Sequence, residues 1–369
     1  MSNKLVMTLT GIRPDFVRMA EIFRKLDERF HHVLVHSGQH FDANLSDVFF
    51  DELKIRQPDY NLGIGGFNRD HVEQQALLGP AIINLIRNEK LHPDIVLFLG
   101  DSNSALAAIP LKKEGIKIGH IEAGMRSGDE WMPEEINRIC CDHVSSFLFA
   151  YHADNLKNLM NEGIPLDRVH VVGNTIVEIA RPIIRNLFQN PKKKAHILVD
   201  IHRHENIMNP IRLKNIVSLV QSLQKTYQLP VIWIGFKRTN QALADAGIKL
   251  DEFPKGHCLI IEPTSYKKFM ELQYHAAFMV SDSGTAQEEP ALLGTPVIVP
   301  RSSTERPQSI AGMCSIMTDV GPDANVNLNL MSANLFLTGH LHGMMHPQIA
   351  WLGDGSTSEH IINVLEDEL

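Results

Sequence analysis

The chain has 369 residues, of which 44% are hydrophobic, enough to bury the cores of two domains of ordinary size. Its formal net charge of −8, with no long basic run, argues against a nucleic-acid partner. No apolar run is long enough to span a membrane and the start lacks the features of a signal peptide, so we expect a cytoplasmic protein.

The first expected strand covers residues 4–10 and ends in a glycine turn followed by Arg13 and Pro14. Pro14 suits the first turn of a helix, where its missing N–H costs nothing. Arg13 is thereby placed at the carboxyl end of a strand, where open α/β sheets bind ligands and a guanidinium can reach a diphosphate. Arg18, one helical turn further on, either joins Arg13 or is a solvated helix residue.

A second strand is expected at residues 31–36, followed by a polar loop. His40 and Asp42 in this loop are candidates for substrate contact of second rank, because such loop residues more often cap helices or face solvent.

Two buried-type strands, residues 94–99 and 116–121, are each followed by an acidic side chain, Asp101 and Glu122. The carboxyl ends of parallel strands meet at one edge of a sheet, so these two carboxylates are expected to lie together. Glu134 falls in the first turn of the next helix, where acids are common because of the helix dipole. Its proximity to the other acids favours a functional role.

The alternation of strands and helices restarts at His196 after a basic linker, which predicts a second doubly wound domain. Its first strand ends at His202. A later strand, near residue 280, leads into Ser283, Gly284 and Thr285, whose amides are expected to open a helix and to seat a phosphate. An ordinary turn would have the same local sequence, but the polar cluster 301–307 after the next strand favours a ligand.

The segment DSGTAQEE followed by PVIVPRSSTERP resembles the C-terminal signature of the UDP-N-acetylglucosamine 2-epimerase family. The segments HIEAGMR, PEEINR and HRHEN are similar to further motifs of that family. The resemblance implies an α/β, GT-B-like fold of two Rossmann-like, doubly wound domains facing a central cleft. The expected boundaries are residues 1–175 for the domain of the sugar and the catalytic carboxylates, 176–355 for the UDP-binding domain, and 356–369 for a helix that crosses back.

The resemblance also implies the site. The catalytic residues expected from it are Asp101, Glu122, Glu134 and His202. The substrate-binding residues expected from it are Arg13, Arg18, Arg138, Ser283, Gly284, Thr285, Glu289 and Arg306. Within this set, Glu289 would hold the ribose.

The C2 carbon of a UDP-sugar is not adjacent to a carbonyl group, so its proton cannot simply be removed and returned. UDP must first be eliminated to give a glycal and then be added back. Such a reaction needs several carboxylates as proton acceptors and donors. No cofactor is expected, because there is no net oxidation, and no metal, because arginine and histidine can carry the diphosphate charge. The implied partner is a UDP-sugar, and relatives suggest a homodimer.

Several alternatives stay open. The segments HSGQHFDANLSD and MPEEINRI are closer to epimerases of UDP-2,3-diacetamido-glucuronate. A hydrolysing epimerase, which releases free UDP, and a GT-B glycosyltransferase are further alternatives. The sequence does not assign which carboxylate removes the C2 proton.

Overall fold

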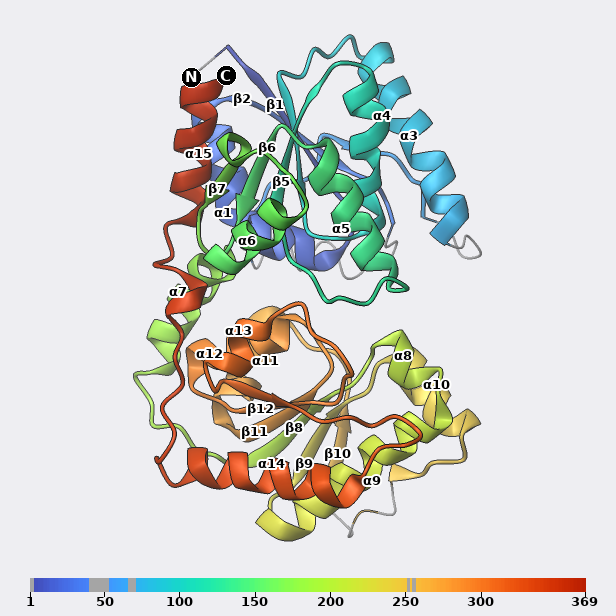
Figure 1. Ribbon diagram of the computed structural model, residues 1–369, viewed down its shortest axis with the longest axis vertical. Helices are drawn as coiled ribbons and strands as arrows, with labels where there is room; N and C mark the ends of the chain where they lie inside the picture. The colour runs from blue at the N-terminus through green and yellow to red at the C-terminus, as the bar shows by residue number, and fades with distance from the viewer. Residues whose placement is uncertain (1–2, 40–52, 66–70, 251–252, 254–256) are drawn as a thin grey trace. The chain divides into compact units, whose positions relative to one another are not determined.

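The computed structural model describes the chain except for residues 1–2, 40–52, 66–70, 251–252 and 254–256 (Figure 1). The chain divides into two compact units, one of residues 1–179 with 351–369 and one of residues 180–350. Each unit contains a sheet of parallel strands with helices packed on it. The predicted α/β class is therefore confirmed in both halves of the chain.

The sheet of the first unit has, in the described residues, seven strands in the order β3-β2-β1-β4-β5-β6-β7, all parallel. Its strands are β1 (Leu5–Thr10), β2 (His31–His36), β3 (Tyr60–Asn61), β4 (Ile95–Leu99), β5 (Lys117–Ala123), β6 (Phe147–Ala150) and β7 (Val169–Val171). The main helices are α1 (Arg13–Arg29), α3 (His71–Asn88), α4 (Ala108–Lys113), α5 (Pro133–Val144), α6 (Ala153–Asn161) and α15 (Thr357–Glu368), and α7 (Ile176–Leu187) leads out of the unit.

The central strands β1 and β4 are buried along their whole length, as expected for a parallel sheet covered on both faces. The order of the sheet places β4 between β1 and β5. Consequently the carboxyl ends of these three strands, near which Arg13, Asp101 and Glu122 lie, are neighbours at one edge. β5 runs two residues beyond its expected end at residue 121 and includes Glu122.

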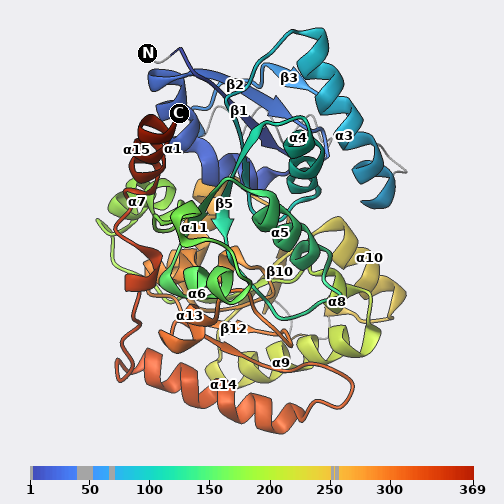
Figure 2. The ribbon, with the colours of Figure 1, turned by 45° about the horizontal axis from the view of Figure 1, so that its top comes forward.

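The C-terminal helix α15 lies alongside α1 in the first unit, as both views show (Figures 1 and 2). Ion pairs join the two helices, from Lys25 to Glu359 and, at 2.9 Å, from Arg29 Nη1 to Glu366 Oε1. The start of α15 is held by Glu178, whose Oε1 accepts from the backbone N–H of Ser358 at 3.1 Å. This end of the chain is thereby fixed to the helix that begins at Arg13.

The sheet of the second unit has, among the residues described, six strands in the order β10-β9-β8-β11-β12-β13, again all parallel. Its strands are β8 (His196–Asp200), β9 (Val231–Ile234), β10 (Cys258–Ile261), β11 (Ala276–Ser281), β12 (Val297–Val299) and β13 (Ser315–Met317). Its helices are α8 (His204–Ile207), α9 (Pro210–Tyr227), α10 (Lys237–Asp245), α11 (Tyr266–His275), α12 (Glu289–Leu293), α13 (Pro307–Ala311) and α14 (Val326–Leu341).

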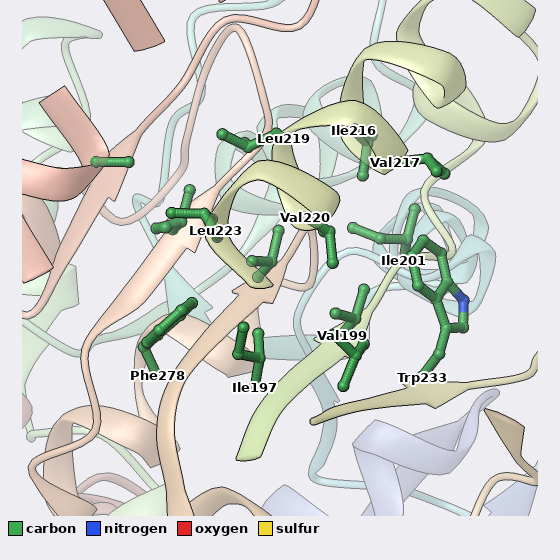
Figure 3. Close-up of a cluster of buried hydrophobic side chains, with 14 of the residues drawn as sticks. Ile197, Val199, Ile201, Ile216, Val217, Leu219, Val220, Leu223, Trp233 and Phe278 are labelled. Atoms are coloured by element: carbon green, nitrogen blue, oxygen red, sulfur yellow. The ribbon is translucent and has the colours of Figure 1, made fainter. Parts of the chain in front are cut away.

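The core of this unit is built from both faces of its first strand. Ile197 and Val199 of β8 point to the face covered by α9, where they join Val220 and Trp233 (Figure 3). Leu198, between them in sequence, belongs to the core cluster of the other face. Each such side chain contributes about 1.5–3 kcal/mol by leaving water, and together they fix the strand end that carries His202.

Within the described residues, no helix combines the length and the apolar character needed to cross a bilayer. The same part of the chain contains no group of three or more His, Cys, Asp or Glu side chains arranged to hold a metal ion.

Candidate functional site

Two residues with left-handed backbone mark the edge of the sheet in the first unit. Gly100, directly after β4, has φ +69°, and Glu122, within β5, has φ +73°. A residue with a Cβ adopts this conformation at a cost of about 1–2 kcal/mol, and such strain is concentrated at functional sites. A Cβ added at Gly100 would lie 3.4 Å from Glu122 Oε2. The carboxylate of Glu122 therefore lies beside the residue that precedes Asp101.

Buried arginines pair with these carboxylates. Arg18 Nη1 donates to Glu122 Oε2 at 3.1 Å, and the two side chains are 3% and 8% exposed. Arg138 donates from one terminal nitrogen to Asp101 and from the other to Glu135 Oε2, the latter at 2.5 Å. A neighbouring guanidinium favours the ionised form of a carboxylate, which is the form that can accept a proton.

Asp15 is a further acid at the same edge that sequence reasoning did not select. Its Oδ2 accepts from the backbone N–H of Gly11 at 2.8 Å and of Ile12 at 3.1 Å, and Ser102 Oγ donates to it at 3.4 Å. Burial raises the pKa of Asp15 to about 7, and the charge of Asp101 adds to the effect although the hydrogen bonds oppose it. Asp15 joins the turn before Arg13 to the loop after Asp101.

In the second unit, His202 follows β8 and contacts two acids. Its Nδ1 donates to Asp200 Oδ1 at 3.1 Å and lies 3.7 Å from Asp282 Oδ1. Burial works to lower the pKa of His202, but the charges of Asp200 and Asp282 outweigh it and raise the pKa above its ordinary value. The side chain keeps 37% of its surface exposed, so the imidazole can reach a ligand.

Glu305 is the centre of a buried ion network in the loop after β12. Its two carboxylate oxygens accept from Arg203 Nη2 at 3.1 Å, Arg301 Nη1 at 2.9 Å and Arg306 Nη1 at 2.8 Å. Arg306 also donates from Nε to Glu288 Oε1 at 2.6 Å. The network joins the loop after β8, the loop after β11 and the loop after β12.

The loop after β11 packs against this network at Gly284. A Cβ at Gly284 would lie 2.6 Å from Arg306 Nη1 and 2.9 Å from Glu305 Oε1, so any other residue here would displace these two side chains of the network. The expected continuous helix is replaced by a 3-10 turn, Thr285–Gln287, followed by the short α12, in which Pro290 stands in the first turn. Because Pro290 lacks an N–H, it suits the start of a helix and not its interior, so α12 begins afresh there.

The comparisons with known proteins agree over nearly the whole chain. The family model of UDP-N-acetylglucosamine 2-epimerase matches residues 24–366. The UDP-N-acetylglucosamine 2-epimerase of Methanococcus maripaludis is 34% identical over 372 residues, covering 98% of each chain. The chain belongs to the UDP-N-acetylglucosamine 2-epimerase family.

Two further proteins of this epimerase family are similar to the chain. The crystal structure of the Methanocaldococcus jannaschii UDP-GlcNAc 2-epimerase in complex with UDP-GlcNAc and UDP superposes with a TM-score of 0.88 at 32% identity, covering 99% of both chains. The UDP-2,3-diacetamido-2,3-dideoxy-D-glucuronate 2-epimerase of Pseudomonas aeruginosa is 33% identical, over 81% of this chain and 84% of its own. The predicted GT-B-like pair of Rossmann-like domains and the predicted epimerase family are both confirmed.

The structure of this epimerase family member groups the residues selected from sequence into two sets. One lies at the edge of the first sheet and one at the edge of the second. Arg13 is half-buried as the first residue of α1, and Glu134 is half-exposed in the first turn of α5. Arg18 is nearly inaccessible, which fits a role in holding Glu122 better than direct contact with a diphosphate. His40 and Asp42 lie outside the described residues.

In the second unit, two selected groups already have protein partners. The backbone N–H of Ser283 donates to Ser281 Oγ at 3.1 Å, so it supports the turn itself. Glu289 Oε2 accepts from Gln273 Nε2 at 3.0 Å. Sequence reasoning placed Glu288 beside Glu289 as a carboxylate for the ribose and Glu305 in the polar cluster 301–307, but it did not foresee that both acids pair with Arg306.

Proposed function

We propose that this protein inverts C2 of a UDP-2-acetamido sugar, with UDP-GlcNAc and UDP-ManNAc as its two substrates. The observation that carries the proposal is the placement of Asp101 and Glu122 at adjacent strand ends, each paired with a guanidinium. The ligand-bound relative named above supports the choice of nucleotide sugar.

The proposed reaction begins when a carboxylate of the first unit takes the C2 proton. The electron pair of the C2–H bond forms the C1=C2 bond of a glycal, and the bond from C1 to the phosphate oxygen breaks, so that UDP leaves by anti elimination. Proton delivery to the opposite face of C2 and return of UDP to C1 complete the inversion. Asp101, Glu122 and Glu134 supply the proton acceptor and donor.

The departing UDP requires stabilisation of its negative charge, and we assign this to Arg13 together with groups of the second unit. His202 holds a proton on Nδ1 for Asp200, and the second proton of its charged form, on Nε2, can be donated to a phosphate oxygen. Glycine at position 284 lets this turn pack directly against Arg306 and Glu305, and we assign the backbone of the turn to the phosphate groups. Arg138 orients Asp101 and needs no contact with the sugar for that role.

A second candidate substrate is UDP-2,3-diacetamido-glucuronate. The UDP-2,3-diacetamido-2,3-dideoxy-D-glucuronate 2-epimerase of Pseudomonas aeruginosa, which is 33% identical to this chain, favours it. Its reaction at C2 is the same, so the two candidates differ only in which groups on C3 and C5 are accepted.

The purified protein should be given each nucleotide sugar separately, and the products followed by proton NMR. The proposal expects UDP-GlcNAc and UDP-ManNAc to reach a mixture at constant total UDP-sugar. Inversion of the diacetamido-glucuronate alone would transfer the proposal to that substrate. Accumulation of free UDP with free ManNAc would establish the hydrolysing reaction in its place.

A further inference from the structure

His120 is a fully buried side chain in β5 whose two ring nitrogens both contact acceptors. Nδ1 lies 2.6 Å from Asp142 Oδ1, and Nε2 lies 2.8 Å from the carbonyl oxygen of Gly100. A carbonyl oxygen and an ionised carboxylate can only accept, so this geometry calls for an N–H on each nitrogen. The arrangement is therefore that of an imidazolium paired with a carboxylate inside the unit.

The groups around the ring support this pair. Burial works to lower the pKa of His120, but Cys141 and Asp142 beside the ring outweigh it and raise the pKa well above its ordinary value. Burial works to raise the pKa of Asp142, and His120 and Arg126 together hold it below its ordinary value. Arg126 Nη1 contacts Asp142 Oδ2 at 2.8 Å, so the carboxylate has a cation on each oxygen.

The pair is tied to the backbone on both sides of the two carboxylates. Nε2 of His120 donates to Gly100, the residue before Asp101, and the N–H of Gly100 donates to Ile121 O at 3.0 Å. Asp142 Oδ2 accepts from the N–H of Gly124 at 3.1 Å, two residues beyond Glu122. Gly100, Glu122 and Gly124 all have left-handed backbone, which turns the chain out of the sheet at the ends of β4 and β5. His120 and Asp142 contact these same two strand ends.

We propose that His120 and Asp142 are positioning residues that set the carboxylate of Asp101 against that of Glu122. As far as it concerns turnover, this inference rests on the proposed function. Neither residue touches substrate. They hold the ends of β4 and β5 in fixed positions relative to each other. The carboxylates of Asp101 and Glu122 can then both reach C2 of the sugar, one as proton acceptor and one as proton donor.

A purely structural ion pair would contain the same two residues, and removal of either charge would then lower stability alone. In the positioning role the contact with Gly100 is needed for turnover, whereas in the structural role it contributes to stability alone. Asparagine at position 120 places its amide nitrogen where Nδ1 stood and can donate to Asp142, whereas glutamine places its nitrogen where Nε2 stood and can donate to Gly100. Both substitutions remove the positive charge and each keeps one of the two contacts, so their difference weighs the contact with Gly100 against the contact with Asp142.

The experiment measures kcat and KM for UDP-GlcNAc, and the melting temperature, of His120→Asn and His120→Gln. We expect kcat to fall about 100-fold in His120→Asn and about tenfold in His120→Gln, with KM within about threefold of wild type in both. His143, a surface histidine of α5 that pairs with Glu162 and is 46% exposed, supplies the control His143→Asn, which should behave as wild type. Equal losses of kcat in the two His120 variants, following equal losses of melting temperature, would overturn the proposal.

Asp142→Asn provides a second test should His120→Asn not fold. It keeps the contact of His120 with Gly100 and weakens the hold on Gly124. We expect a fall in kcat of about tenfold at unchanged KM, and wild-type turnover would count against the pair.

A wild-type protein that inverts neither nucleotide sugar would refute the proposed function and not the positioning role. Crystal structures of the two His120 variants then decide the latter. We expect the Asp101 carboxylate to move relative to Glu122 in His120→Asn and to stay in place in His120→Gln. An unmoved Asp101 in both would overturn the inference.

Discussion

The two units place acids and arginines at the same edge of their parallel sheets, but they expose the acids differently. In the first unit Asp101 is 29% exposed while it pairs with Arg138, and Glu122 is 8% exposed while it pairs with Arg18. In the second unit Glu288 and Glu305 are 0% and 1% exposed. A carboxylate that takes part in proton transfer must keep some surface for the substrate, as Asp101 and Glu122 do, whereas Glu288 and Glu305 keep at most 1% and can only shape the structure around them.

The comparison suggests that one unit performs chemistry with its side chains and the other binds with a backbone that its side chains hold in shape. The ion network around Glu305 supports the Gly284 turn, and His202 is the exposed charged group beside it. If so, substitutions in the first unit should affect turnover, and those in the second should affect stability and UDP affinity.

The largest expected effect is that of Glu122→Gln. The amide has the same shape but cannot accept the C2 proton, so turnover should fall by about 10³-fold or more, with the Kd for UDP within a factor of about two. Proton NMR and calorimetric titration measure the two quantities. Glu114→Gln, at an exposed residue paired with Arg87, is the matched control. A comparable loss of UDP affinity in Glu122→Gln would break the division between the units.

Glu305→Gln tests the other side of the comparison. It leaves Arg203, Arg301 and Arg306 without the carboxylate that they share, and an uncompensated buried charge costs about 3–5 kcal/mol. We expect urea denaturation to show a loss of this size, and the Kd for UDP to rise. Glu271→Gln, at a 44%-exposed residue paired with Lys268, should change neither. A free energy of unfolding equal to that of wild type in Glu305→Gln would show that the network does not stabilise this unit.

Arg138→Lys should have a smaller effect on turnover. Lysine is a point charge on a flexible stem and cannot pair with Asp101 and Glu135 at once as the guanidinium does. We expect kcat to fall about tenfold with little change in UDP affinity. The exposed Arg87→Lys provides the comparison. A large rise in KM at unchanged kcat would instead assign Arg138 to substrate contact.

Asp15→Asn is expected to have the smallest effect on turnover, and its effect appears in the pH dependence of stability. The folded-state pKa of Asp15 is raised from 3.8 to about 7, so the folded protein binds more protons than the unfolded chain between these values. The free energy of unfolding of wild type therefore falls as the pH rises from 4 to 7, by at most about 1.4 kcal/mol per pH unit. Above pH 7 this group causes no further loss.

The Asn variant has no proton to lose at position 15. Its melting temperature relative to wild type should thus rise across pH 4 to 7 and level off above. A difference that is constant with pH would show that Asp15 is ionised in the folded protein.

The fold was predictable because alternating strand and helix patterns are local, and the rule that ligands meet the carboxyl ends of parallel strands selected Asp101, Glu122 and His202. The pairing of Arg18 with Glu122, 104 positions away, was not predictable, because it depends on the strand order β1-β4-β5. The same holds for Glu305 and its arginines, which come from two loops. Sequence pattern gave no sign that Glu122 has left-handed backbone or that Asp15 is sealed from water.

The most direct test of the account is to incubate the wild-type protein with UDP-GlcNAc in D₂O and to follow the C2 proton by NMR. Removal of that proton by a carboxylate predicts that UDP-GlcNAc and UDP-ManNAc both acquire deuterium at C2 as they approach equilibrium. UDP-GlcNAc that is bound by the protein but keeps its C2 proton, with no manno epimer formed, would contradict the account.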